Sequence, residues 1–157
     1  SLYSALTDDE VVEVSRVVVE HVRGRAMTVV ADRTWATPKA VEFARFARET
    51  GADMYMALPP DWALSCTQDS LVAHYAAVAK EIPVMVVTNY LMPRSREFSM
   101  GLLQRLVREA PGVVAVKDDL VGEFARHLGL TAHEHFALVS GGQKQNHLNA
   151  LPYGCDG

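Results

Sequence analysis

Five short apolar runs, separated by segments of helical character, constrain the fold of this chain more than any other feature. The runs recur at intervals of roughly 25 to 30 residues, which is typical of a repeated structural unit. Each run is continuously apolar rather than alternating, as expected for strands covered on both faces. Strands and helices in alternation predict right-handed β-α-β units, a parallel sheet and an α/β fold. The runs span residues 27–31, 54–58, 84–88, 113–117 and 136–140.

Helix signals fill the intervals between the runs. Thr7 and Glu10 fit a capping box that opens a helix ending at Gly24. Pro38 fits the first turn of a second helix, which Gly51 ends. Because no Gly/Ser-rich linker interrupts residues 1–157, a single domain is expected. Further helices are expected over 68–80, 99–109 and 120–128, and after 141–142.

Two architectures fit this pattern. One is an open, doubly wound sheet, which could be complete at 157 residues. The other is a (β/α)₈ barrel, which normally needs about 250 residues. No GxGxxG or GxxxxGK motif follows a strand, so the nucleotide-binding form of the open sheet has no positive support.

Composition excludes several classes of function. The net charge of −4 and the absence of a basic run argue against a nucleic-acid partner. The apolar runs are too short to cross a membrane and no signal peptide is recognisable, so a cytoplasmic location is expected. Cys66 and Cys155 form no disulfide or metal pattern. His133 and His135 lack a third ligand nearby, and His74 is expected on a helix surface, so no metal is expected.

Lys117 is the residue most suggestive of chemistry. It ends the apolar run 113–116 and precedes Asp118 and Asp119. A lysine removed from water loses hydration, which favours the neutral amine that attacks a ketone. A solvated lysine at a strand end is the alternative interpretation.

A series of sequence blocks resembles one enzyme family. In chain order these are GADMYMALPP (51–60), QDSLVAHY (68–75), PVMVVTN (83–89), PR (93–94), VVAVKD (113–118) and VSGG (139–142). Read in order, they look like the dihydrodipicolinate synthase and N-acetylneuraminate lyase family of class I aldolases. The resemblance implies a (β/α)₈ barrel, of which this chain would hold the part from the second helix to the seventh. It also implies a Schiff-base lyase, either aldolase or dehydratase, that acts on pyruvate or another 2-keto acid without a cofactor, as a homodimer or homotetramer.

Within this resemblance, Lys117 is the amine that forms the imine. Arg94 matches an arginine at the mouth of the site, where its guanidinium can hold a carboxylate. Asn89 matches the asparagine of a Tyr-Asn pair on the fifth strand. Gly142 lies in the loop after the seventh strand, where backbone amides could bind an anion, although a tight turn explains this glycine equally well.

The chain departs from the family at two places. Keeping Asn89 in register with the family asparagine places Thr88 where the proton-transferring tyrosine is usual, whereas counting back from Lys117 without a gap places Asn89 there. Tyr90 is the nearest phenol. If the strand continues that far, a period of two turns Tyr90 to the same side as Thr88. The segment with Asp61 and Trp62 lacks the tyrosine that many members place after proline. These changes leave open a non-catalytic relative of the family that only binds a ligand or partner.

Overall fold

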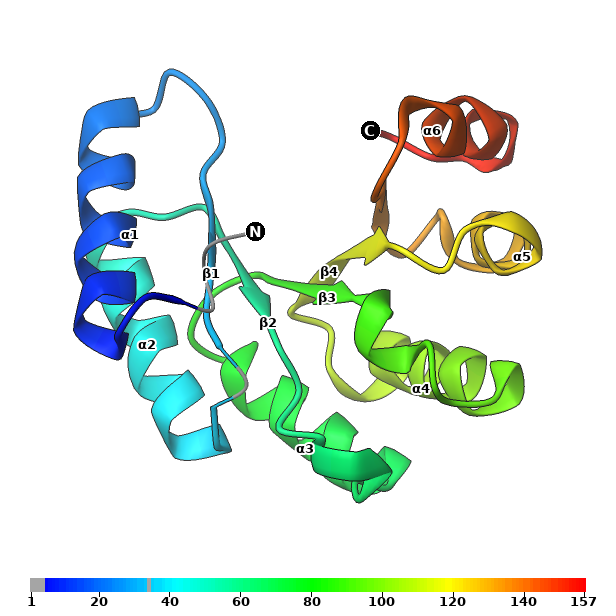
Figure 1. Cartoon of the computed structure of the whole chain (residues 1–157), viewed down its shortest axis with the longest axis horizontal. Coiled ribbons are helices and arrows are strands. Elements are labelled where there is room, and N and C mark those ends of the chain that lie inside the picture. Colours follow the sequence, from blue (N-terminus) through cyan, green and yellow to red (C-terminus); the bar gives the residue numbers. More distant parts are fainter. Residues whose placement is uncertain (1–4, 34) are drawn as a thin grey trace.

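The strands form one all-parallel sheet in a computed structural model that describes residues 5–33 and 35–157. Neighbours in the sheet follow the chain in the order β1-β2-β3-β4-β5. A doubly wound sheet reverses its order at a switch point, whereas a barrel does not. The helices form an arc around the outer side of the sheet, from α1 to α6 (Figure 1). The strands are Val29–Ala31 (β1), Met54–Ala57 (β2), Val84–Val87 (β3), Val113–Asp118 (β4) and Ala137–Ser140 (β5).

Local sequence signals place most helices as predicted. Thr7 and Glu10 form the expected capping box, in which the Glu10 carboxylate accepts from Thr7 N at 2.7 Å and Thr7 Oγ1 accepts from Glu10 N at 3.3 Å. Pro38 lies in the first turn of α2, and Gly51 ends it in the left-handed conformation. The helices are Asp8–Val22 (α1), Thr37–Thr50 (α2), Gln68–Val78 (α3), Arg96–Glu109 (α4), Gly122–Ala132 (α5) and Lys144–Ala150 (α6).

Several boundaries differ from expectation; α5, for example, spans Gly122–Ala132 rather than 120–128. Helix α4 begins at Arg96 rather than at 99, because the Ser95 hydroxyl accepts a hydrogen bond from Phe98 N and caps the helix earlier. Strand β3 ends at Val87, and Thr88–Leu91 forms the 3₁₀ helix η3. The premise that Tyr90 continues the strand alternation is therefore wrong.

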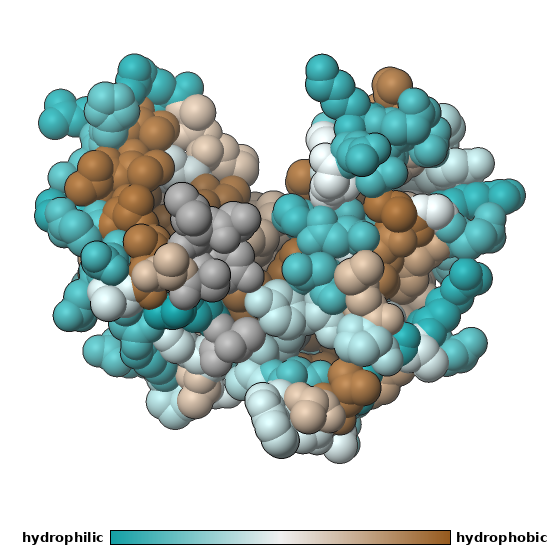
Figure 2. All heavy atoms as spheres, viewed as in Figure 1, coloured by the Kyte–Doolittle hydropathy of each residue, from teal (hydrophilic) through white to brown (hydrophobic). Residues whose placement is uncertain are grey.

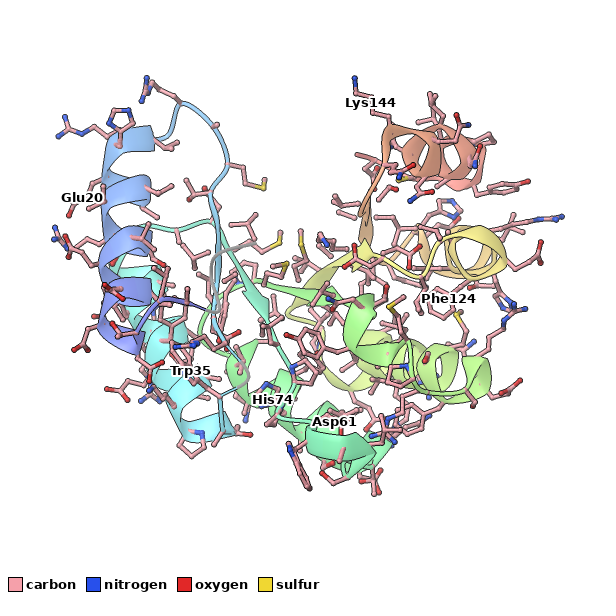
Figure 3. The ribbon with its side chains drawn as sticks, in the orientation of Figure 1. Glu20, Trp35, Asp61, His74, Phe124 and Lys144 are labelled. Atoms are coloured by element: carbon pink, nitrogen blue, oxygen red, sulfur yellow. The ribbon has the colours of Figure 1, made fainter. Side chains whose placement is uncertain are left out.

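The sheet has two apolar faces. The outer face packs against the helices and includes Tyr55, Val84, Val86 and Val116 in the main core. The inner, concave face carries a smaller cluster built around Met54, Met85 and Ala115. Sulfur atoms gather along this side of the strands (Figure 3), and the space-filling view is hollowed between the α1 side and the α6 side (Figure 2). The concave face is where side chains of several strands can converge on a ligand.

Gly129 allows α5 to touch the 3₁₀ helix η4 (Leu151–Tyr153). A Cβ at this position would lie 2.2 Å from the Tyr153 carbonyl oxygen, which is backbone and cannot rotate away. We expect Gly129→Ala to lower the free energy of unfolding by about 1–3 kcal/mol through overpacking. The midpoint of urea unfolding measures the change.

The matched control is Gly101→Ala in α4. There the new Cβ would meet only the amide end of the Gln68 side chain, at 2.8 Å, which can move. Alanine has the higher helix propensity, so the control is expected to be neutral or slightly stabilising. Equal urea midpoints for the two variants would contradict the prediction.

Candidate functional site

Lys117 lies near the carboxyl end of β4, in the middle of a three-strand ladder. Its partners in the register are Val87 of β3 and Val139 of β5. In parallel α/β folds, binding sites lie at the carboxyl ends of the strands. The Lys117 side chain is 33% exposed, so it is neither sealed in the core nor free in solvent.

A cavity of about 440 Å³ opens beside Lys117. Its wall comes from the carboxyl ends of four neighbouring strands and from η3. Apolar side chains with a few polar groups are typical of a small-ligand site. Lys117 therefore lies at a cavity rather than remote from one. The lining residues are Ala31, Asp32, Met56, Leu58, Val87, Asn89, Tyr90 and Lys117.

The amine of Lys117 is paired with a carboxylate. Its Nζ lies 2.7 Å from both Oδ1 and Oδ2 of Asp119. Asp119 follows β4, and its side chain is 18% exposed. Hydrogen bonds to both carboxylate oxygens fix the position of the amine at the cavity wall.

Thr88 ties the ends of β3 and β4 together. Its hydroxyl donates to Asp118 Oδ1 at 2.9 Å and accepts from Asp119 N at 2.8 Å. The same Asp118 carboxylate accepts from the backbone N–H groups of Leu120 and Val121. Thr88 is fully buried and does not line the cavity. Through these two hydrogen bonds, Thr88 stabilises the turn that carries Asp119.

Asn89 and Tyr90 lie on η3 and both line the cavity with Lys117. Asn89 is exposed and Tyr90 is half-buried. The change from strand to 3₁₀ helix at Thr88 is what turns these two residues, rather than Thr88, toward the cavity. The sequence therefore predicted the correct segment for the site, but the Thr88 side chain does not line the cavity.

Arg94 lies outside the cavity wall, contrary to its expected place at the mouth. Its Nη2 donates to Asp61 Oδ2 at 2.6 Å and to the Cys66 carbonyl at 2.8 Å, and its guanidinium lies over the Phe98 ring. Figure 3 places Asp61 beside α3, away from β4. Burial acts to raise the pKa of Asp61, but hydrogen bonds from Arg94 and from Cys66 N hold the pKa below its ordinary value. Both charged groups are already used in holding this loop.

Gly142 also lies outside the cavity wall. It follows β5 with φ +83°, a conformation that favours glycine, and its surface is exposed. Helix α6 begins two residues later, at Lys144. The backbone conformation accounts for this glycine, as the tight-turn alternative expects.

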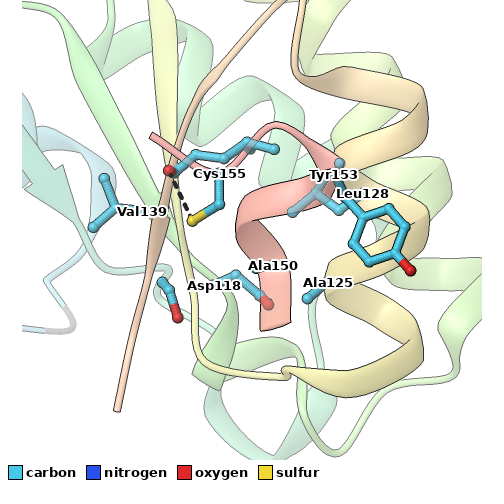
Figure 4. Close-up of a pocket in the computed structure, with 10 residues that line it drawn as sticks. Asp118, Ala125, Leu128, Val139, Ala150, Tyr153 and Cys155 are labelled. Atoms are coloured by element: carbon cyan, nitrogen blue, oxygen red, sulfur yellow. Dashed lines mark hydrogen bonds between the residues drawn. The ribbon is translucent and has the colours of Figure 1, made fainter. Parts of the chain in front are cut away.

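A second pocket lies between β5, α5 and the end of the chain (Figure 4). Cys155 Sγ lies 3.4 Å from the Leu138 carbonyl oxygen there, and Leu128 and Tyr153 contribute apolar walls. Its volume of about 10 Å³ leaves room for about one water molecule. The cavity beside Lys117 is the better candidate for a ligand.

Comparison with known proteins decides the family. The profile of the dihydrodipicolinate synthetase family matches residues 3–157. The chain belongs to this family. A 4-hydroxy-tetrahydrodipicolinate synthase from Dechloromonas aromatica (strain RCB) is 31% identical over 136 residues, which cover 85% of this chain and 46% of the relative. A probable 5-dehydro-4-deoxyglucarate dehydratase 1 from Streptomyces coelicolor is 36% identical over 118 residues, covering 75% of this chain and 36% of the relative.

Solved structures of the dihydrodipicolinate synthetase family agree with the fold. A Pseudomonas aeruginosa protein assigned as a dihydrodipicolinate synthetase superposes with a TM-score of 0.81 at 28% identity, covering 98% of this chain and 53% of that chain. This similarity and the unreversed parallel sheet show part of a (β/α)₈ barrel, as predicted. The chain spans about half the length of the curated dihydrodipicolinate synthases it matches, or less.

Asp32 and His74 form buried polar sites that sequence reasoning missed. Asp32 directly follows β1, is 2% exposed, and accepts hydrogen bonds from the Tyr55 hydroxyl and, at 3.0 Å, from Leu58 N. Burial raises the pKa of Asp32 to about 7. A carboxylate directly after a buried strand was the available signal.

The expectation that His74 lies on a helix surface is wrong. The residue is 2% exposed, and its Nδ1 lies 2.9 Å from the Thr37 hydroxyl. Burial lowers the pKa of His74 to about 4. Figure 3 shows the ring on the side of α3 that faces the sheet. Helix α3 is apolar on most of its circumference, so sequence alone did not distinguish its buried face.

Among the described residues, no three His, Cys, Asp or Glu side chains lie close enough together to hold a metal ion. His133 and His135 are exposed, as expected. Among residues 5–33 and 35–157, no helix combines the length and apolar character needed to cross a bilayer.

Proposed function

We propose that the protein is a class I aldolase-type lyase or dehydratase that forms an imine between Lys117 and a 2-keto acid such as pyruvate. The observation that carries the proposal is the position of Lys117 Nζ at a ligand-sized cavity, at the carboxyl end of a barrel strand. Membership of the family supports it, as do the activities for which its relatives are named, a synthase and a dehydratase.

The chemistry begins with attack of the Lys117 amine on the keto carbon. The C–N bond forms, the carbonyl oxygen leaves as water, and a protonated imine remains. This iminium accepts the electron pair that is released when a proton or an aldehyde leaves the neighbouring carbon. Reversal of the same steps joins an aldehyde to the enamine, and loss of a hydroxyl group from the substrate gives a dehydration.

The proposal gives the predicted site residues other than Gly142 a role consistent with their positions. Because Tyr90 and Asn89 line the cavity, the Tyr90 phenol is the proposed substitute for the missing tyrosine, and the Asn89 amide is proposed to hydrogen-bond the substrate. Thr88 positions the turn after β4. Arg94 supports the loop through Asp61 rather than holding a substrate carboxylate. A homo-oligomer in the cytoplasm remains part of the proposal, and light scattering would measure its size.

Reductive trapping tests the proposal directly. Incubation with pyruvate and borohydride should leave the reduced pyruvyl adduct on the tryptic peptide that contains Lys117. The matched reaction without pyruvate controls for modification by borohydride alone. No adduct with pyruvate or with several larger 2-keto acids would overturn the assignment.

A second candidate is a family member that binds a ligand without catalysis. The ion pair between Lys117 and Asp119 and the absence of the family tyrosine at Thr88 favour it. A keto acid that raises the melting temperature but gives no covalent adduct would support this alternative.

A further inference from the structure

We propose that Asp119 is the proton acceptor and donor for imine formation at Lys117. The inference rests on the proposed function and assigns the proton transfer to a group of this chain. Carboxylates serve as general acids and bases when they lie within hydrogen-bond reach of the reacting atom. Both Asp119 oxygens lie 2.7 Å from Lys117 Nζ, which is the atom that must lose a proton before it can attack.

The carboxylate is held in place by contacts outside the ion pair. The backbone N–H of Asp119 donates to Thr88 Oγ1 at 2.8 Å, and Thr88 is itself fully buried. Gly141 N donates to the Asp118 carbonyl at 2.7 Å, so the loop after β5 lies against the same turn. The turn that carries Asp119 is therefore fixed from both neighbouring strands.

Gly141 leaves the space that Asp119 occupies. A Cβ on Gly141 would lie 1.6 Å from Asp119 Oδ1 and 2.7 Å from its Cγ. No side chain can stand at position 141 while Asp119 keeps this contact with Lys117. The two residues come from different strand ends, and together they create room for a carboxylate beside the amine.

The neighbouring carboxylate cannot take the same role in this arrangement. Asp118 is buried, and its oxygens accept from the Thr88 hydroxyl and from the backbone N–H groups of Leu120 and Val121. Its side chain organises the turn. Of the two adjacent aspartates, Asp119 is the one that contacts the reacting nitrogen.

The proton balance of the step closes without another reactant. The Lys117 ammonium gives a proton to the Asp119 carboxylate, and the resulting amine attacks the keto carbon. The carbinolamine then loses its hydroxyl group as water, with the proton returned by the Asp119 carboxylic acid. The products are the iminium, one water molecule and the original carboxylate, which remains beside the new positive charge.

The rate of borohydride trapping at saturating pyruvate tests this assignment. General acid–base catalysis typically contributes about 10²–10⁴-fold, so Asp119→Asn should slow trapping by a factor in this range. Gly141→Ala keeps the carboxylate but displaces it, and is expected to slow trapping as well. Glu123→Gln is the charge-matched control, because Glu123 is an exposed residue of α5, and it should trap at the wild-type rate.

Chemical rescue separates proton transfer from a structural role. In Asp119→Ala, added formate can enter the vacated space and should restore a large part of the trapping rate in proportion to its concentration. Urea midpoints of the variants verify that they are folded, and Gly141→Ala provides the second comparison if Asp119→Asn is destabilised. Wild-type rates in both Asp119 variants, or a slow Asp119→Ala variant that formate does not restore, would overturn the inference. Failure of the wild-type protein to trap any keto acid would instead overturn the proposed function.

Discussion

Replacing Lys117 with arginine should abolish covalent trapping and turnover of a 2-keto acid. Arginine keeps a positive charge that can remain paired with Asp119, but its guanidinium stays protonated and does not form the imine. Enzymes typically accelerate reactions by about 10⁶-fold or more, and this substitution removes the covalent route on which the acceleration depends. We therefore expect activity to fall to the background rate while the fold is kept. Mass spectrometry after borohydride reduction and a steady-state assay measure the two losses.

The matched control is Lys144→Arg. Lys144 lies at the start of α6, and Figure 3 shows its side chain extending away from the strands. This variant should trap pyruvate on Lys117 at the wild-type rate. An adduct that persists in Lys117→Arg, carried by any other lysine, would mean that the nucleophile has been misassigned.

Replacing Asp32 or His74, which are buried and have shifted pKa values, should change the pH dependence of stability in opposite directions. The folded protein binds a proton on Asp32 more tightly than the unfolded chain, because its pKa rises from 3.8 to about 7. The stability that Asp32 contributes is present below about pH 4 and is lost as the pH rises to 7. The pKa of His74 falls from 6.5 to about 4, so its contribution is present above pH 6.5 and is lost as the pH falls to 4.

In the wild-type protein these two slopes oppose each other between about pH 4 and 6.5. Asp32→Asn leaves the His74 slope, so stability should rise over this interval by roughly 3 kcal/mol. His74→Gln leaves the Asp32 slope, so stability should fall from pH 4 to 7 by roughly 4 kcal/mol. Above pH 7, Asp32→Asn should be more stable than the wild type, since the cost of burying the charge is gone.

Urea unfolding of the wild type and both variants at several pH values between 4 and 8 measures these slopes. The differences between the proteins in the free energy of unfolding at each pH are the informative quantity, because the remaining titratable groups are common to all three proteins. Parallel curves for Asp32→Asn and the wild type would show that the carboxyl titrates with an ordinary pKa in the folded state.

The local elements follow from the sequence because their signals act over a few residues. The Thr7 capping box, Pro38 and Gly51 set the ends of α1 and α2 where expected. The continuous apolar runs became the five parallel strands. The early start of α4 at Arg96 depends on the Ser95 cap, a local signal that was present but not used.

The candidate site is only partly predictable for the opposite reason. Lys117 was identified because the apolar residues directly before it in the sequence form the strand that carries it. Arg94 was placed at the site, yet it pairs with Asp61, 33 residues earlier in the chain. Thr88 was assigned to proton transfer, yet its hydroxyl bonds to Asp118 at the end of the next strand and to Asp119 N directly after it. These partners are distant in sequence, so no local pattern reveals them.

By itself, the sequence determined the alternation of strands and helices, the parallel sheet and the lysine at the end of β4, since capping, turn geometry and apolar patterning are short-range effects. Only the tertiary structure decided which polar groups share that end of the sheet. The pairing of Lys117 with Asp119, the room left by Gly141 and the burial of Asp32 all depend on how neighbouring strand ends stack. Packing sets these distances, and packing is fixed only when the whole sheet and its helices come together.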